Sequence, residues 1–268
     1  MKVSRARSIR KPIVRDRLYG QDESPLMSGV IAVPVRRDAD VDIVLIAGLW
    51  LEESAWAGVA ARLGECGHRP VPVALPGQGD GSTSATLADQ AAAVLAAVDS
   101  AEGRPMVVGH SAASTLAWLA ADARPEKVGK AAFIGGWPAP DGEPYFDGLP
   151  VKDGAVPFPG WDEFEGPDSA DLDDAARRAF AARAIPVPEG VASAVVRLAD
   201  PRRYAVPAVL ICPEFTPAQI SELISQGELP ELAKITNLSL VDIDTGHWPM
   251  LTAPAELARL IDQVAAGS

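Results

Sequence analysis

The sequence predicts an α/β domain in which a mostly parallel sheet is flanked by helices and interrupted by one long insertion. Short apolar runs of the strand type alternate with longer helix-type segments, an order typical of crossover units around a parallel sheet. At one of these transitions a strand beginning at Met106 turns sharply at residues 109–113 into a helix. Between residues 137 and 207 the alternation stops, and a stretch rich in Pro, Gly and aromatic residues takes its place.

The composition excludes several classes of protein. The chain has 268 residues, 48% of them hydrophobic and 22% charged, as in an ordinary soluble globular protein. Its formal net charge of -12 argues against nucleic acid and anionic membranes as partners, and no apolar run approaches the length of a membrane span. Cys66 and Cys212 lie far apart and match no metal or redox spacing, which favours a reducing, cytoplasmic location and no metal site.

The N-terminal residues 1–28 are expected to form a flexible extension, and residues 29–268 a single α/β domain. The extension begins with many Arg and Lys residues but has no hydrophobic segment, so it does not read as a secretory signal. Two alternative interpretations of this segment are an upstream start before a more ordinary beginning near Met27 and a basic anchor for a partner.

The strands and helices follow from the pattern along the chain. Residues 29–35 include Pro34, which cannot donate to a ladder, so an edge strand is expected there. Residues 41–47 form a continuous apolar run, typical of a parallel strand buried on both faces. Further strands are expected at residues 71–75, 106–108, 130–134, 208–212 and 238–243. Helices are expected at residues 54–64, 87–98, 114–121, 171–184, 191–198, 217–226, 229–234 and 254–264.

The turn after Met106 makes Ser111 the candidate nucleophile. A serine at the apex of a strand–turn–helix is held in strained backbone geometry, so its neighbours must be small. Gly109, Ala112 and Ala113 meet that demand, although the last position more often holds glycine. Such a turn exposes the hydroxyl above the sheet and aims the N–H of the next residue, Ala112, at an oxyanion.

A serine hydroxyl is a poor nucleophile until a base accepts its proton, and three histidines are available. His110 is adjacent to Ser111, and its side chain is expected to point away and pack locally. His68 precedes a strand and is expected at the opposite end of the sheet. His247 follows the last strand, at the edge where parallel sheets place their ligands, so we expect His247 to be the base.

The stretch at residues 137–207 is expected to form a lid, because a long irregular insertion in a compact domain is usually functional. Its aromatic side chains could face a substrate or anchor the lid to the body, and the sequence leaves both readings open. They are Trp137, Tyr145, Phe146, Phe158, Trp161 and Phe164.

From residue 41 to the C-terminus the pattern resembles the α/β-hydrolase superfamily. Three motifs carry the resemblance, each in its expected order and element context: residues 47–50 with Trp56 downstream, the turn at 109–113, and residues 246–250 after the last strand. Within the superfamily the chain looks most like the small, lid-bearing, esterase-like enzymes that include plant ester hydrolases and hydroxynitrile lyases.

The resemblance implies a catalytic triad and an oxyanion hole. It places the acid after the strand that ends at Cys212, where Glu214 is the first carboxylate; the family more often has Asp at the positions where this chain has Phe215 and Thr216. Some members take the acid after the preceding strand, where Asp141 is the alternative. The implied oxyanion donors are the backbone N–H groups of Leu49 and Ala112. Trp50 and Trp137 are the expected substrate-binding side chains.

These observations predict a serine hydrolase of the carboxylesterase type that cleaves a small ester, thioester or lactone through an acyl-enzyme on Ser111, with no cofactor. The expected substrate is a small molecule with an apolar acyl or aromatic part, and the sequence sets no oligomeric state. Two alternatives remain, because fold does not determine reaction. One is a lyase, C–C bond hydrolase or cyclase of a biosynthetic pathway, and the other is a small-molecule-binding receptor.

Overall fold

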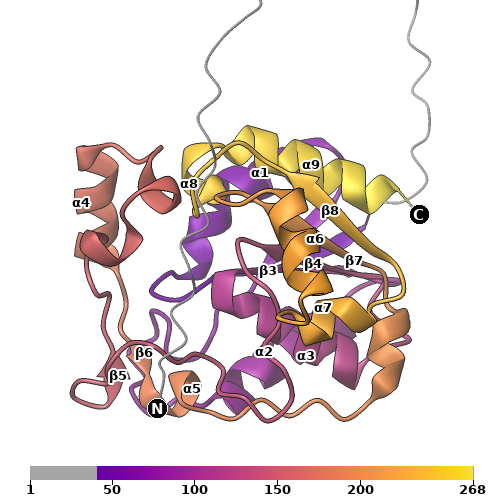
Figure 1. Cartoon of the computed structure of the whole chain (residues 1–268), viewed down its shortest axis with the longest axis horizontal. Helices are drawn as coiled ribbons and strands as arrows, with labels where there is room; N and C mark the ends of the chain where they lie inside the picture. The colour runs from indigo at the N-terminus through magenta and orange to yellow at the C-terminus, as the bar shows by residue number, and fades with distance from the viewer. Residues whose placement is uncertain (1–40, 268) are drawn as a thin grey trace, which may run out of the picture.

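The computed structural model describes residues 41–267 and contains a parallel sheet of six strands (Figure 1). The strand order is β2-β1-β3-β4-β7-β8, and every neighbouring pair is parallel. The strands are β1 (Asp42–Ile46), β2 (Arg69–Pro72), β3 (Met106–His110), β4 (Lys130–Ile134), β7 (Ala208–Cys212) and β8 (Leu238–Asp242). The expected mostly parallel sheet is confirmed.

The apolar runs form strands because both of their faces are covered. Val44 and Ile46 of β1 belong to one hydrophobic core, whereas Ile43 and Leu45 belong to the other. This alternation follows from the two-residue period of a strand. A sheet buried on both faces therefore explains why β1 is continuously apolar rather than alternating.

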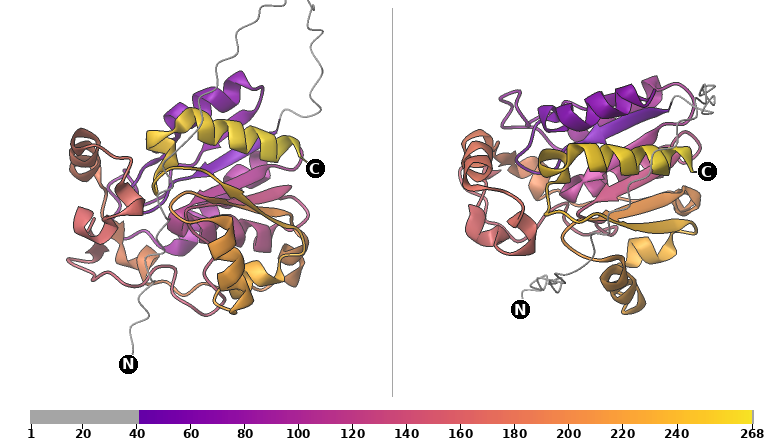
Figure 2. Two further views of the ribbon diagram at one scale, coloured as in Figure 1. Left: turned by 45° about the horizontal axis from the view of Figure 1, so that its top comes forward. Right: turned by 90° about the horizontal axis from the view of Figure 1, so that it is seen from above.

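Helices cover both faces of the sheet (Figure 2). Helices α1 and α9 pack against each other and contribute to one core, and α2, α3, α6 and α7 contribute to the other. The helices are α1 (Ala57–Glu65), α2 (Leu87–Ser100), α3 (Ser114–Ala123), α4 (Asp174–Arg183), α5 (Glu189–Ala192), α6 (Pro217–Ser225), α7 (Pro230–Lys234), α8 (Pro249–Thr252) and α9 (Pro254–Ala266). Short 3₁₀ helices are η1 (Glu53–Trp56), η2 (Ser111–Ala113), η3 (Trp161–Phe164), η4 (Pro167–Ser169) and η5 (Pro201–Ala205).

The segment that we call the insertion, residues 137–207, lies between β4 and β7 in the chain. It contains η3, η4, α4 and a small antiparallel sheet of β5 (Ala155–Val156) and β6 (Val187–Pro188). Figure 1 shows α4, β5 and β6 on the side of the molecule where α8 follows the last strand. The insertion therefore lies toward the carboxyl ends of the sheet strands, where ligands of such sheets bind.

Two expected elements differ from the structure. The expected helix at residues 191–198 is wrong beyond Ala192, because residues 192–196 pair with residues 142–146 through backbone hydrogen bonds, including Val196 N to Glu143 O at 2.8 Å. The second strand, expected at residues 71–75, ends at Pro72. It is an edge strand with two prolines, which cannot donate to a ladder.

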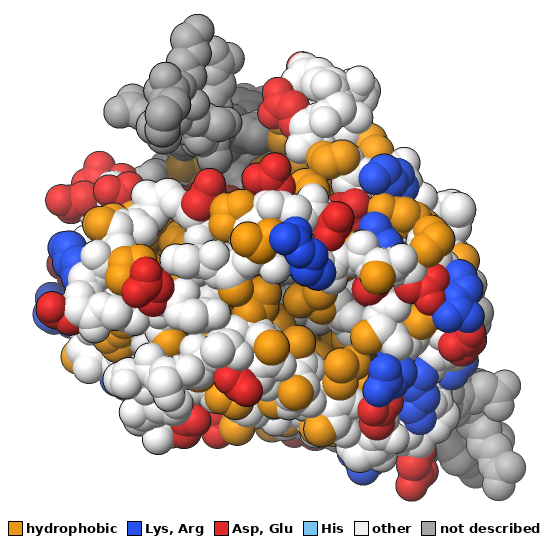
Figure 3. All heavy atoms as spheres, turned by 90° about the horizontal axis from the view of Figure 1, so that it is seen from below, with side chains coloured by type: hydrophobic (Ala, Val, Ile, Leu, Met, Phe, Trp, Pro, Cys, Tyr) orange, Lys and Arg blue, Asp and Glu red, His pale blue; other side chains and the backbone are white. Residues whose placement is uncertain are grey.

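The expected flexible extension at residues 1–28 and the expected strand at residues 29–35 lie outside the described residues. Within residues 41–267, no helix is long and apolar enough to cross a membrane. Figure 3 shows one face of the molecule, on which hydrophobic side chains gather near the centre with charged side chains among and around them.

Candidate active site

Ser111 lies at the end of β3, where the strand turns into η2 and α3. Its φ angle is 55°, in the left-handed region that non-glycine residues avoid. Only two other described residues besides glycine, Trp50 and Asp153, have a positive φ. The strained turn that the sequence predicts at Ser111 is therefore present.

Small neighbours allow this turn to pack tightly. A Cβ atom on Gly109 would lie 2.2 Å from the carbonyl oxygen of Ala113, and one on Gly136 would lie 2.6 Å from that of Ser111. Both distances are shorter than any van der Waals contact, so these positions require glycine for close approach. The turn at Ser111 is therefore packed closely on two sides: Gly109 lies against Ala113, and Gly136, in the segment that follows β4, lies against the backbone of Ser111.

His247 lies in the loop between β8 and α8, close to this turn. The ring of His110, the residue before Ser111, has its centroid 4.9 Å from that of His247. Gly135, which precedes the glycine packed on Ser111, lies against the His247 ring, with only 3.2 Å from its Cβ position to Nδ1. The structure thus brings Ser111 and His247 into neighbouring loops, although no hydrogen bond joins their side chains among the described residues.

Glu214 is the carboxylate that contacts His247. The Nδ1–H group of His247 donates to Oε1 of Glu214 at 2.8 Å, and both side chains are 13% exposed. This contact fixes the tautomer of the imidazole and leaves Nε2 as the acceptor. The alternative acid, Asp141, is exposed and accepts a hydrogen bond from the backbone N–H of Leu198 at 2.9 Å, within the insertion.

The two residues after Glu214, where the family more often has Asp, have other contacts here. Phe215 is buried and packs against Trp137, with ring centroids 5.9 Å apart. Thr216 caps α6, accepting from the N–H of Gln219, whose side chain accepts from the N–H of Thr216 in return. The first carboxylate after β7 is therefore the one placed to reach His247.

Charge around His247 favours its protonated form. Burial alone would lower the pKa of His247, but the negative charge and hydrogen bond of Glu214, together with the charge of Asp168, raise it above its ordinary value. Asp168 belongs to η4 of the insertion, and burial followed by the charge of Glu214 raises the pKa of its carboxyl group. The neutral imidazole of His247 therefore binds a proton more tightly than an isolated imidazole does.

His110 is expected from the sequence to point away and pack locally, but its side chain contacts the loop of His247. It is fully buried, and its Nε2–H donates to the carbonyl oxygen of His247 at 2.7 Å. Burial, followed by the charge of His247, lowers the pKa of His110 to about 3, so its ring is neutral. His68, in contrast, pairs with Asp262 of α9, with 3.0 Å between Nε2 and Oδ1.

The loop after β1 lies against Ser111. A Cβ atom on Gly48 would lie 2.6 Å from Nδ1 of His110 and 3.2 Å from Cβ of Ser111. Leu49, the next residue, is buried, and within residues 41–267 its N–H has no hydrogen-bond acceptor. A free N–H beside the serine is what an oxyanion donor requires.

Trp50 joins this loop to the insertion. Its Nε1–H donates to the carbonyl oxygen of Val156 in β5 at 3.2 Å, and its own carbonyl accepts from the N–H of Ile185 at 3.0 Å. Edge-to-face ring contacts connect it to Phe158 and Phe164, with centroids 5.5 and 5.8 Å away. The side chain expected to bind substrate is thus also an anchor of the insertion.

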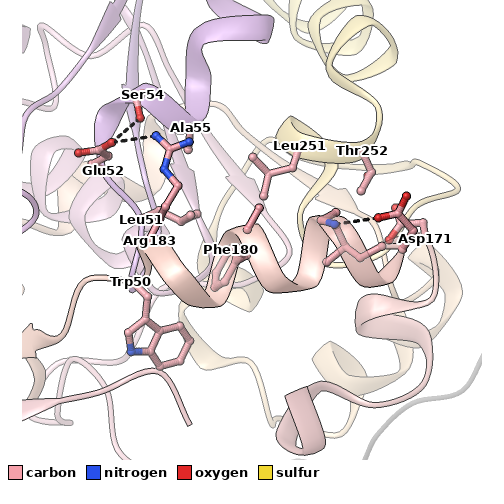
Figure 4. Close-up of a pocket in the computed structure, with 14 residues that line it drawn as sticks. Trp50, Leu51, Glu52, Ser54, Ala55, Asp171, Phe180, Arg183, Leu251 and Thr252 are labelled. Carbon is pink, nitrogen blue, oxygen red and sulfur yellow. Dashed lines mark hydrogen bonds and ion pairs between the residues drawn. The ribbon is translucent and has the colours of Figure 1, made fainter. Parts of the chain in front are cut away.

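Three aromatic residues of the insertion pack on the loop of His247. Trp248 contacts Trp161, Phe164 and Phe180, with ring centroids 5.2 to 5.4 Å apart. These contacts favour the anchoring reading for this part of the insertion. A cleft of about 520 Å³ opens between α4 and the body (Figure 4), and Trp50, Phe180 and Leu251 are among its walls.

Asp168 and Asp171 touch the loop at residues 243–248, here called the histidine loop, and nothing in the sequence pattern marks them for the site. The carbonyl oxygen of Asp168 accepts from the N–H of His247 at 2.7 Å, and the carboxylate of Asp171 accepts from the N–H of Gly246 at 2.9 Å. Both residues lie in the irregular part of the insertion, where no periodicity marks a residue as facing the site. The richness in acids of residues 162–174 is the only signal, and it is equally typical of a solvated surface.

Comparison with known proteins agrees with the fold. A model of the alpha/beta hydrolase family matches residues 43–260. The chain therefore belongs to the alpha/beta hydrolase family, and the expected resemblance is confirmed. A search of curated proteins finds no match.

Solved structures share the fold at low sequence identity. An extracellular alpha/beta-hydrolase from a Paenibacillus species, described as homologous in structure and function to tobacco salicylic acid binding protein 2, matches with TM-score 0.69 and 18% identity, over 83% of this chain and 98% of its own. A pyrethroid hydrolase from Sphingobium faniae matches with TM-score 0.66 and 20% identity, over 85% and 98%. A methylesterase from Arabidopsis matches with TM-score 0.64 and 14% identity, over 84% and 99%. At these identities the likeness shows the fold.

Proposed function

We propose that the protein is a serine hydrolase that cleaves a small ester, thioester or lactone through an acyl-enzyme on Ser111. The observation that carries this proposal is the hydrogen bond between His247 and Glu214 at 2.8 Å, beside a serine with a φ angle of 55°. Acyl transfer requires a base whose tautomer is fixed and a nucleophilic serine that is exposed by a strained turn with small neighbouring residues. Membership of the alpha/beta hydrolase family supports the same reading.

The reaction follows from these roles. Oγ of Ser111 attacks the carbonyl carbon while Nε2 of His247 takes its proton, and the carbonyl π electrons move to oxygen. The backbone N–H groups of Leu49 and Ala112 stabilise that oxyanion, each contributing about 3 kcal/mol in the transition state. The tetrahedral adduct then collapses, and the leaving alkoxide or thiolate takes the proton from His247. In the second half, His247 takes a proton from water, which attacks the acyl-enzyme; collapse of that adduct returns the proton to Oγ of Ser111 and releases the carboxylic acid.

Glu214 supports both halves of this cycle. His247 becomes an imidazolium twice per turnover, and a carboxylate on Nδ1 stabilises that charge without accepting the proton. The insertion is proposed to act as a lid, with Trp50 and Trp137 beside an apolar acyl or aromatic part of the substrate. A cytoplasmic location, suggested by the cysteine usage, remains a prediction.

Labelling with a fluorophosphonate, followed by intact-mass measurement, tests the proposal. The native protein should gain one adduct, which should be absent in Ser111→Ala and slow in His247→Ala and Glu214→Gln. Asp141→Asn should label at the native rate. A folded native protein that gains no adduct would contradict the proposal and favour the lyase or receptor alternatives.

A further inference from the structure

The loop that carries His247 has few hydrogen bonds of its own. Between the end of β8 at Asp242 and the start of α8 at Pro249, one bond joins Thr245 N to Ile243 O, and the Thr245 hydroxyl donates to the carbonyl oxygen of Gly246. The position of the imidazole therefore depends on bonds that the loop makes to other parts of the molecule. This matters because misplacing a catalytic group by about 1 Å can cost about 100-fold in rate.

The segment after β7 supplies the bond of Glu214 to the ring, and the N–H of Ile243 donates to the carbonyl oxygen of Cys212 at the end of β7. The backbone next to His247 is held from two further sides. From the turn at residues 109–113, His110 donates to the carbonyl oxygen of His247. From the insertion, the carbonyl oxygen of Asp168 accepts from the N–H of His247, and the carboxylate of Asp171 accepts from the N–H of Gly246. Asp171 contributes the side-chain acceptor of this pair, across 75 residues of sequence.

The insertion packs closely against the loop at Gly246. A Cβ atom there would lie 2.3 Å from Oδ1 of Asp171 and 2.5 Å from the carbonyl oxygen of Asp168. Gly246 is not among the described glycines with a positive φ, so its conformation alone does not require glycine. The glycine before the histidine is needed for contact with the insertion, and a change at Asp171 acts directly on the backbone next to His247.

We propose that Asp171 is a positioning residue for His247, holding the histidine loop through the N–H of Gly246 so that Nε2 faces Ser111. In this proposal the insertion positions the catalytic base in addition to acting as a lid. Asp171 touches neither the substrate nor the reacting atoms in this scheme; it acts through the loop. The inference rests on the proposed function, in which His247 is the base.

The bond from a backbone N–H to a carboxylate is stronger than a bond to a neutral acceptor. The position of the loop, however, depends on an acceptor oxygen at this place and not on its charge. An asparagine in place of Asp171 keeps an acceptor oxygen, whereas an alanine removes it. Asp173 provides a matched control: its carboxylate accepts from the N–H of Ala176 at 2.7 Å and caps α4, so its loss weakens the insertion without touching the histidine loop. Both aspartates line the cleft between α4 and the body, where Figure 4 labels Asp171, but Ser111, His247 and Glu214 are not among the residues that line it.

The test compares Asp171→Ala, Asp171→Asn and Asp173→Ala in the full chain, with p-nitrophenyl butyrate as the probe ester. Asp171→Ala should lower kcat by about 10- to 100-fold with KM within about threefold of native, because transition-state geometry and not ester binding is lost. Asp171→Asn should restore kcat to within about threefold of native, and Asp173→Ala should lower thermal stability with kcat within about twofold. Equal kcat in Asp171→Ala and Asp173→Ala, or no rescue by asparagine, would overturn the proposal.

The proton NMR signal of the His247 Nδ1–H group separates this inference from the proposed function. That signal should be sharp in the native protein and in Asp171→Asn, and broadened or lost in Asp171→Ala, because a loosened loop exposes the proton to exchange. This readout needs no turnover. If the native protein neither labels with fluorophosphonate nor cleaves the ester, the proposed function fails, and an unchanged Nδ1–H signal in Asp171→Ala would overturn the inference by itself.

Discussion

The Nδ1 atom of His247 lies 2.8 Å from Oε1 of Glu214, which follows β7 by only two residues. The family more often has Asp one or two positions later. A glutamate side chain is one methylene longer than that of aspartate, so it can reach the imidazole from an earlier position in the loop. The length of the side chain and the position in the loop compensate each other, and the pair keeps the geometry that acyl transfer needs.

Replacing the charge of Glu214 tests this pairing. Glu214→Gln keeps the size of the side chain but removes the charge that stabilises the imidazolium and the preference for the Nδ1–H tautomer. We expect kcat/KM to fall by about 10³- to 10⁴-fold, as is typical when a triad acid is neutralised. Glu214→Asp, with a shorter reach, should also lose activity. Asp141→Asn is the control, and a comparable loss there would show that the acid is misassigned.

The pH dependence of activity should report the charges around His247. The base must be neutral to act, so a raised pKa moves the acid limb of kcat/KM above pH 6.5, the ordinary value for histidine. The groups that face His247 are Glu214, Asp168 and neutral His110. Asp168→Asn removes a negative charge that favours the imidazolium, so the pKa of His247 should fall and the acid limb should move to lower pH.

The control for this shift is Asp162→Asn, which removes an equal charge from an exposed side chain of the same insertion. It should leave the acid limb unchanged. Movement of the limb to higher pH in Asp168→Asn, or an equal shift in both variants, would contradict the assignment of Asp168 as a charge that acts on His247.

Local pattern was enough to predict the parallel sheet and the positions of Ser111 and His247. Each of these depends on a few neighbouring residues, such as an apolar run followed by a turn with small side chains. The expected helix at residues 191–198 failed because pairing with residues 142–146 overrode local preference. The roles of Asp168 and Asp171 could not be predicted for a related reason. Their contacts with the histidine loop join segments far apart in the chain, and an irregular stretch has no periodicity that indicates which carboxylate points inward.

His110 should matter through its hydrogen bond to the carbonyl oxygen of His247. His110→Ala leaves that partly buried carbonyl without its donor, a change that costs about 1 kcal/mol, so we expect lower thermal stability and about a tenfold loss of kcat/KM. His110→Gln can present an amide N–H to the same oxygen and should recover part of both. Native kcat/KM in His110→Ala would show that the bond has no role in placing the histidine.

The pKa of His110, at about 3, gives a second check on this residue. A neutral ring with a fixed Nε2–H is needed if it is to donate at every pH at which the enzyme works. In an NMR titration the His110 ring signals should stay constant from pH 5 to pH 9, while those of His247 move. A transition of His110 within that range would mean that its ring is more solvated than the structure indicates.

The strain at Ser111 should be measurable as stability. Both Ser111→Gly and Ser111→Ala remove the nucleophile, but only glycine adopts a φ angle of 55° without cost, and relief of such strain is about 1–3 kcal/mol. Glycine also increases the entropy of the unfolded chain by about 0.5–1 kcal/mol. We therefore expect Ser111→Gly to be more stable than Ser111→Ala by about 1 kcal/mol in urea unfolding. Ser114, the first residue of α3, supplies the reverse case, because in a helix glycine is less stable than alanine by about 1 kcal/mol. If alanine were the more stable replacement at both serines, the turn at Ser111 would not be strained, and the exposure of its hydroxyl would need another explanation.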